Sequence, residues 1–104
     1  MAIQKTGAAA WRIHPGEVLR EEFLKPMNIT PYRLARRLFV SPPTVNDIVL
    51  ERRRITPEMA ARLAVVFGTS EQFWLNLQSA YDVSRIKAEK ARELKQIKPF
   101  AVHA

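Results

Sequence analysis

Six arginines flank the short segment SPPTVNDIV, which begins at Ser41 and ends at Val49. Guanidinium groups bind phosphate oxygens through paired, charge-assisted hydrogen bonds, so two clusters of them can hold a polyanion from two sides. We expect these side chains, together with the hydroxyl of Thr30, to contact phosphates. The arginines are Arg33, Arg36 and Arg37 before the segment, and Arg52, Arg53 and Arg54 after it.

The segment itself offers few hydrogen-bond donors, because two of its residues are prolines. On a helical wheel its Val and Ile side chains share an inward face, and the remaining side chains lie outward or on the flanks. Proline rings can pack against thymine methyl groups, asparagine can pair with adenine N6 and N7, threonine can meet a base or a phosphate, and aspartate can accept from cytosine N4. The predicted base-reading residues are Pro42, Pro43, Thr44, Asn46 and Asp47.

Helix start signals place this segment in a fold. Thr30, Ser41 and Thr56 each stand before a proline, which puts an N-cap hydroxyl ahead of a residue whose φ already suits a helix. With the spacing of apolar residues, these signals predict an all-α chain of five helices with no strand. The expected ranges are about 16–25, 31–38, 42–50, 57–67 and a longer helix from about 71.

The second and third helices are joined by about three residues, which is helix-turn-helix geometry with the third helix in the major groove. One residue of the turn departs from that geometry. Phe39 stands where glycine is expected, and a left-handed conformation there costs a non-glycine residue about 1–2 kcal/mol. The alternative interpretation is an ordinary helical hairpin with a solvated arginine face.

The totals narrow the class of protein further. The chain has 104 residues, enough for one domain, and a net charge of +7, which favours a polyanionic partner. It has no cysteine, and its two histidines, His14 and His103, lie near no nucleophile or ligand set. We therefore expect no enzyme activity, cofactor, metal or small-molecule substrate. No apolar run suits a membrane span or a signal peptide, so we expect a cytoplasmic protein.

Three stretches resemble the HigA antitoxins, the VapI-type branch of the XRE helix-turn-helix family, whose fold is lambda-repressor-like. They are HPGEVLREEFL (14–24), LARRLFVSPPTVNDIV (34–49) and RRRITPEMAARLAVVFGTSEQFWLNLQSAYD (52–82), and the most specific part of the last is GTSEQFWLNLQ. The resemblance covers about residues 13–83 as a DNA-binding domain. It leaves a flexible N-terminal arm, 1–12, and a basic helical extension, 84–104. Phe39 departs from the family, which usually has glycine there.

The resemblance implies a protein with two tasks. Such proteins bind and neutralise a HigB toxin, a RelE-like ribonuclease that cuts messenger RNA on the ribosome. As homodimers they also bind a palindromic operator in double-stranded DNA and repress their own operon. The alternatives are a stand-alone XRE-family repressor that meets no toxin, and a module that binds protein only.

Two further surfaces are candidates for protein contacts. The last helix carries more apolar residues than the end of a small bundle needs, so we expect part of this stripe in the core and part at a dimer interface. An acidic face on the first helix is the candidate toxin contact, and a solvated helix face is the alternative. The dimer residues are Phe73, Trp74, Leu77 and Tyr81; the toxin residues are Glu17, Glu21 and Glu22.

Overall fold

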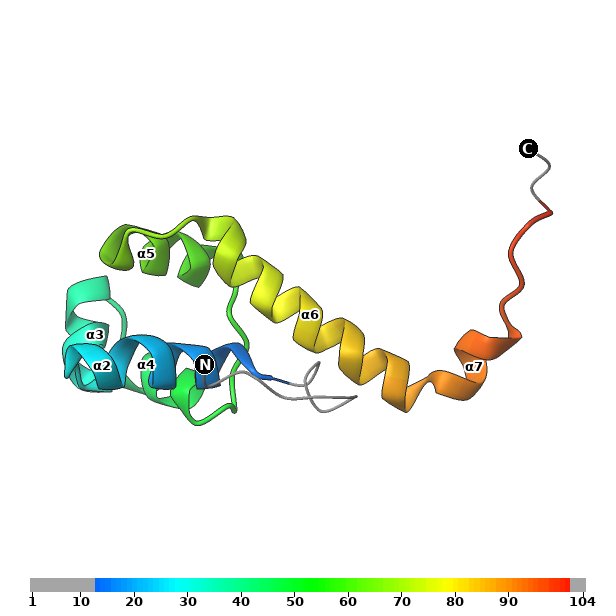
Figure 1. The fold of residues 1–104 in the computed structure, drawn as a ribbon. Helices are drawn as coiled ribbons and strands as arrows, with labels where there is room; N and C mark the ends of the chain where they lie inside the picture. The colour runs from blue at the N-terminus through cyan, green and yellow to red at the C-terminus, as the bar shows by residue number, and fades with distance from the viewer. Residues whose placement is uncertain (1–12, 102–104) are drawn as a thin grey trace.

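The computed structural model describes residues 13–101, and over that range the chain is helical with no β-strand. The predicted arm, 1–12, lies outside the described residues. Five helical segments occur at the predicted places, and a short α7 follows them (Figure 1), so the predicted all-α fold is confirmed. The bounds are α1 Pro15–Val18, η2 Leu19–Leu24, α2 Lys25–Met27, α3 Pro31–Leu38, α4 Pro42–Val49, α5 Pro57–Phe67, α6 Glu71–Glu89 and α7 Ala91–Gln96.

The first three elements form one continuous helical segment whose middle part, η2, is π-helical. The segment passes through Pro26, although a proline ring normally clashes with the carbonyl one turn earlier. The wider π turn before it removes that conflict, since the Lys25 N–H already bonds to the carbonyl of Arg20, five residues back. The helix therefore ends at Met27 rather than near 25, and Asn28 closes it in the left-handed conformation (φ 55°).

Hydroxyl residues stand at the starts of the later helices, and two of the predicted caps, Thr30 and Thr56, bond the backbone as expected. Thr30, Thr56 and Ser70 each accept a hydrogen bond from the backbone N–H three residues on, at 3.0–3.2 Å. Ser41 differs, because its Oγ lies 2.8 Å from Oγ1 of Thr44 instead of bonding the backbone. These four hydroxyl residues thus stand at the starts of α3, α4, α5 and α6, and Ser41 also engages a predicted base-reading residue.

Trp74 is the centre of the hydrophobic core. Its side chain is fully buried, its Nε1 donates to Oγ1 of Thr69 at 2.7 Å, and three phenylalanine rings surround it at centroid distances of 5.0–6.3 Å. The prediction that Trp74 lies at a dimer interface is therefore wrong. The periodicity located an apolar stripe on α6, but Phe23, Phe67 and Phe73 cover this part of it within one chain.

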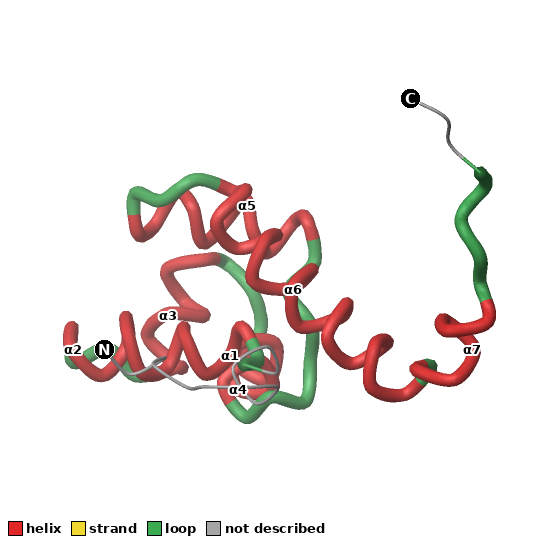
Figure 2. Tube along the Cα trace, turned by 45° about the vertical axis from the view of Figure 1, so that its right-hand side comes forward, coloured by secondary structure: helices red, strands yellow, loops and turns green. Residues whose placement is uncertain are grey.

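The second half of α6 leaves the bundle. The first half packs on α5 and on α1, whereas every residue from 85 to 101 is exposed. Figures 1 and 2 both show α6 running away from the other helices, with α7 at its far end. The molecule is consequently elongated, with extents of 54 × 25 × 24 Å. The extension was expected, but the break at Lys90 between α6 and α7 was not. None of the helices within residues 13–101 meets the length and hydropathy needed to cross a membrane.

Phe39 adopts the left-handed conformation that the turn demands, with φ 59° and a side chain that is 88% exposed. Its N–H and that of Val40 bond back to α3 carbonyls, which closes the helix. The backbone strain is therefore real and no packing of the ring offsets it.

We expect Phe39→Gly to raise the free energy of unfolding by about 1 kcal/mol, because glycine adopts this conformation without a Cβ penalty. Urea unfolding followed by circular dichroism measures the change. Phe39→Ala is the matched control, since it removes the ring but keeps the Cβ. Equal stabilities of the two variants would show that the turn is not strained.

Candidate nucleic-acid interface

The helix-turn-helix consists of α3 and α4, which pack closely against each other. Three residues of α4 (Val45, Ile48 and Val49) are buried in the core, as the helical wheel predicted. The opposite face of α4 is therefore held at the surface, and the first helical segment supports α4 from behind through contacts with α1.

All five predicted base-reading residues lie at the surface on this outer face or its flank. Pro42, Pro43 and Asn46 are exposed, and Thr44 and Asp47 are partly exposed. The hydroxyl of Thr44 is engaged with Ser41. The Asp47 carboxylate lies 3.9 Å from Nη2 of Arg53, so its charge is partly balanced within the chain. Asn46 is thus the side chain on this face that both donates and accepts without such an engagement.

The arginines before α4 lie along one side of α3. Arg33, Arg36 and Arg37 are exposed, and together with Phe39 they line a shallow depression. Arg36 lies over the ring of Tyr32, with 5.9 Å between the guanidinium carbon and the ring centroid. Arg33 lies in the first turn of α3, and Arg36 and Arg37 lie in its last turn, so the three guanidinium groups follow the length of the helix.

The arginines after α4 do not form one cluster. Arg52 and Arg53 are exposed beside the C-terminal end of α4, but Nη2 of Arg54 forms an ion pair with Asp82 of α6 at 2.9 Å. Asp82 also accepts from Gln78, whose own Oε1 accepts from the backbone N–H of Ile55 at 2.7 Å. Arg54 therefore belongs to a network that fixes the loop after α4 to α6, and it does not lie with the other predicted phosphate contacts.

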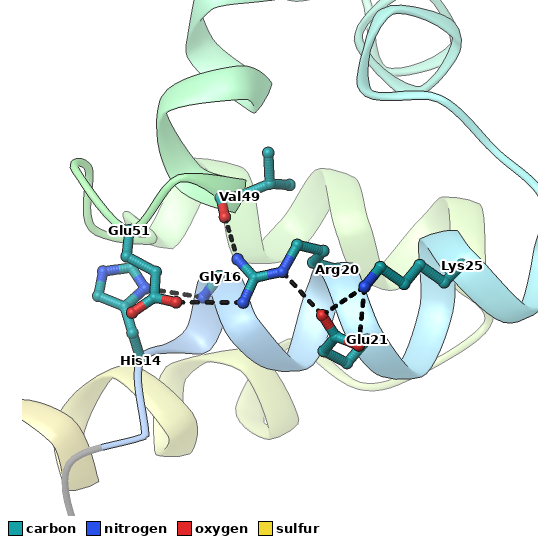
Figure 3. A network of polar contacts seen from close by, with 7 residues as sticks. All are labelled: His14, Gly16, Arg20, Glu21, Lys25, Val49 and Glu51. Carbon is teal, nitrogen blue, oxygen red and sulfur yellow. Dashed lines mark hydrogen bonds and ion pairs between the residues drawn. The ribbon is translucent and has the colours of Figure 1, made fainter. Parts of the chain in front are cut away.

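Arg20 holds the C-terminal end of α4 (Figure 3). Its Nη1 donates to the carbonyl of Val49, its Nη2 pairs with Glu51 at 3.3 Å, and its Nε pairs with Glu21 at 2.9 Å. A cation at a helix C-terminus meets unsatisfied carbonyls and the negative end of the helix dipole. Arg20 therefore orients α4 rather than adding to the charge that faces a ligand.

Arg62 of α5 caps α3 in the same way. Its Nη1 donates to the carbonyl of Leu38 at 2.6 Å, and its Nη2 pairs with Glu58 at 2.7 Å. Both helices of the motif are thus closed at their C-terminal ends by an arginine from elsewhere in the chain. This leaves their outer faces fixed relative to the core.

His14 caps the first helical segment. It is buried, its Nδ1 accepts from the N–H of Gly16 at 2.8 Å, and its ring packs edge-on against Tyr81 with centroids 4.9 Å apart. Burial lowers the pKa of His14 from its usual range, which keeps the imidazole neutral at pH 7 and able to accept. The residue is structural, and no group of three or more metal-ligating side chains occurs in the described part of the chain.

Comparisons with known proteins agree with this geometry. Residues 21–74 match the helix-turn-helix family. Virulence-associated protein I of Dichelobacter nodosus is 51% identical over 78 residues, covering 75% of this chain and 72% of that protein. A structure described as Pseudomonas aeruginosa antitoxin HigA with higBA promoter is 50% identical, with a TM-score of 0.84 over 86% of this chain and 99% of that one. The chain belongs to the HigA antitoxin family.

A relative with a curated antitoxin name supports the same assignment. Antitoxin HigA-1 of Vibrio cholerae serotype O1 is 37% identical over 87 residues, covering 84% of this chain and 82% of that protein. Because these HigA-type relatives are antitoxins and DNA-binding regulators rather than enzymes, the prediction that the chain is not an enzyme is confirmed.

Sequence reasoning missed Tyr32, which lies on this candidate interface, and Arg20, which fixes the C-terminal end of α4. Tyr32 follows Pro31 at the start of α3, is 56% exposed and lies beside the tip of α4. Its position one residue after the N1 proline of α3 could have indicated that Tyr32 lies at this surface, since the start of the first motif helix faces the same way as the reading helix. Nothing in the local sequence indicates that Arg20 reaches a carbonyl 29 residues further along.

The residues of the two predicted protein-contact surfaces differ in their exposure and in their ion pairs. Of the dimer candidates, Phe73 is 37% exposed, and Leu77 and Tyr81 are partly buried. Of the toxin candidates, Glu21 is held by Lys25 and Arg20, whose hydrogen bonds keep the pKa of Glu21 below its usual range. The acidic face is thus partly neutralised within the chain. Its other two members, Glu17 and Glu22, are partly exposed.

Proposed function

We propose that this protein is the antitoxin of a type II toxin–antitoxin module. It binds and neutralises a HigB-type, RelE-like toxin in the cytoplasm and, as a homodimer, binds operator DNA to repress its own operon. The observation that carries the proposal is the exposed face of α4 with arginines on both sides, in a chain half identical to an antitoxin solved with its promoter. The alternative is a stand-alone repressor with no toxin partner.

Co-expression with the protein encoded by the neighbouring reading frame tests the antitoxin role. Relief of growth arrest and co-purification of the two proteins are the expected results. A neighbouring protein that neither arrests growth nor binds this chain would favour the stand-alone repressor, because operator binding would then be the remaining activity.

In the proposed complex, α4 lies in the major groove while α3 contacts the backbone of one strand. Arg33, Arg36 and Arg37 supply the contacts to that strand, with Thr30 at the N-terminus of α3. Arg52 and Arg53 supply contacts at the other end of α4. Phosphate contacts provide affinity and register, whereas the base edges provide sequence preference. We omit Arg54 from the proposed contacts because Asp82 holds it on α6.

Asn46→Ala is expected to weaken operator binding by about 1–3 kcal/mol and to leave binding to random DNA unchanged. Asn46 is exposed on α4, so its removal deletes a base contact without disturbing the core. Fluorescence anisotropy with operator and scrambled duplexes measures both affinities. An equal loss on the two duplexes would refute a base-reading role.

Arg36→Ala and Arg53→Ala are each expected to weaken binding to every sequence and to reduce the magnitude of the negative salt slope, d log K/d log[salt], by about 1. Each removes one phosphate contact and so one set of released counterions. Arg85→Ala is the control, because Arg85 lies on the far part of α6 and pairs with Glu89 at 3.4 Å. An unchanged salt slope in the Arg36 and Arg53 variants, together with a smaller slope in the Arg85 variant, would contradict the proposed phosphate contacts of Arg36 and Arg53.

We also propose that the homodimer forms along the projecting part of α6 and α7. Val83 and Ile86 are each 49% exposed and lie three residues apart on one helix face. Leu94 of α7 and Ile97, directly after α7, are exposed apolar residues further along the chain. Phe73, Leu77 and Tyr81, the remaining dimer candidates, lie on the earlier part of α6. A two-fold axis there would have to place the two copies of α4 about 34 Å apart, one turn of B-DNA.

For the toxin we keep Glu17, Glu21 and Glu22 as the proposed contacts. We expect the toxin to be basic, and within the acidic face Glu21 already pairs with Lys25 and Arg20. The acidic face lies on the first helical segment, away from the exposed side of α4. A toxin bound there would leave the DNA face available, which suits a protein that performs both tasks.

A further inference from the structure

A second shallow depression, separate from the one beside Phe39, lies between the start of α3 and the tip of α4. Two residues of α3 and four of α4 line it, so it forms only because the turn brings the two helices together. The lining residues are Pro31, Tyr32, Pro42, Pro43, Asn46 and Asp47.

The walls of this depression are mostly apolar. Three proline rings and the Tyr32 ring form them, and none of the prolines has a backbone N–H to donate. Polar atoms come from Asn46 and from Asp47, whose carboxylate lies near Arg53. A group that fits is therefore apolar, with hydrogen-bonding atoms on one side.

The surroundings of the depression are strongly cationic. Arg36 lies over the Tyr32 ring at 5.9 Å, and Arg53 lies on the other side next to Asp47. An apolar site between guanidinium groups suits an uncharged part of a polyanion. In the major groove of DNA that part is the 5-methyl group of thymine, which stands next to hydrogen-bonding base edges.

We propose that this depression receives the 5-methyl group of one thymine in each operator half-site, and that Tyr32 is the residue that determines this specificity. The inference rests on the proposed operator binding and adds a residue of α3 to the base-reading set. Arg36 restrains the Tyr32 ring by a cation–π contact and also binds the neighbouring phosphate in the proposed complex. Asn46, on the opposite wall, pairs with the adjacent adenine.

Deoxyuridine substitution tests the proposal, because it removes the methyl group and leaves every hydrogen-bonding atom of thymine in place. Each operator thymine is replaced singly, and affinity is measured by fluorescence anisotropy for the wild type, Tyr32→Phe and Tyr32→Ala. In the wild type, one position in each half-site is expected to lose about four-fold in affinity, the effect of one methyl group left out of an apolar site. We expect Tyr32→Phe to show the same loss of affinity. We expect Tyr32→Ala to bind the thymine and deoxyuridine operators with about equal affinity.

The outcomes separate this inference from the proposed function. If wild-type protein binds the operator but no deoxyuridine position weakens binding, the methyl site is wrong and operator binding stands. If the same position is equally sensitive in wild type and Tyr32→Ala, Tyr32 is not the determinant. If wild-type protein prefers no promoter sequence, operator binding itself fails. Tyr32 is more than half exposed, and thermal unfolding of the variants verifies that they fold.

Discussion

Gly16→Ala is expected to destabilise the domain by about 3 kcal/mol or more, among the largest effects of any single methyl group in this chain. A Cβ at position 16 would lie 1.8 Å from the carbonyl oxygen of Ile48 and 2.8 Å from its carbonyl carbon. Both atoms belong to the backbone of α4, which cannot move aside as a flexible side chain can. The first helical segment would have to separate from the reading helix.

Urea unfolding measures this loss, and Gly68→Ala is the matched control. Gly68 ends α5 at φ 70° and has open space around it, so alanine there meets a conformational penalty of about 1 kcal/mol and no clash. If Gly16→Ala cost no more than Gly68→Ala, the close approach of the first segment to α4 would be wrong. Operator affinity is expected to fall with Gly16→Ala alone, because only that change displaces α4.

Trp74→Ala is expected to cost about 3–5 kcal/mol of folding free energy, the range for removing a large buried aromatic side chain. Trp74 is fully buried and donates to Thr69, and the rings of Phe23, Phe67 and Phe73 would lose their common neighbour. The result should be a domain that unfolds at much lower urea concentration.

The same variant separates a core role from an interface role. Sedimentation equilibrium under native conditions and urea unfolding are measured together, with Phe73→Ala as the control because Phe73 is 37% exposed. We expect a large loss of stability for Trp74→Ala and a smaller one for Phe73→Ala. A Trp74→Ala protein that stays as stable as the wild type but becomes monomeric would return Trp74 to a dimer interface.

The helices could be predicted from the sequence because their start signals are local. A hydroxyl residue before a proline determines the first turn of α3, α4 and α5 through atoms that are neighbours along the chain. The end of the first segment was less predictable. The expected range ends near 25, whereas the helix continues to Met27 through a π turn that depends on hydrogen bonding to residues further back.

The part of the candidate site that depends on a local pattern, the outward face of α4, could also be predicted from the sequence. The wheel placed Asn46 and the prolines outward because the buried face of α4 is apolar. The sequence could not show whether Trp74 lies in the core or at an interface, because periodicity shows an apolar helix face but not what covers that face. Arg20, Arg54 and Arg62 look like any surface arginine in the sequence, and only the fold shows that they bind within the chain.

The most direct test of the central claim is a nuclear magnetic resonance titration of ¹⁵N-labelled protein with promoter DNA. The account predicts that the side-chain amide of Asn46 and the backbone amides of α4 shift strongly, with smaller changes at the start of α3. It predicts unchanged resonances for α7. Shifts confined to α6 and α7, with Asn46 unmoved, would contradict the claim that the exposed face of α4 reads the DNA.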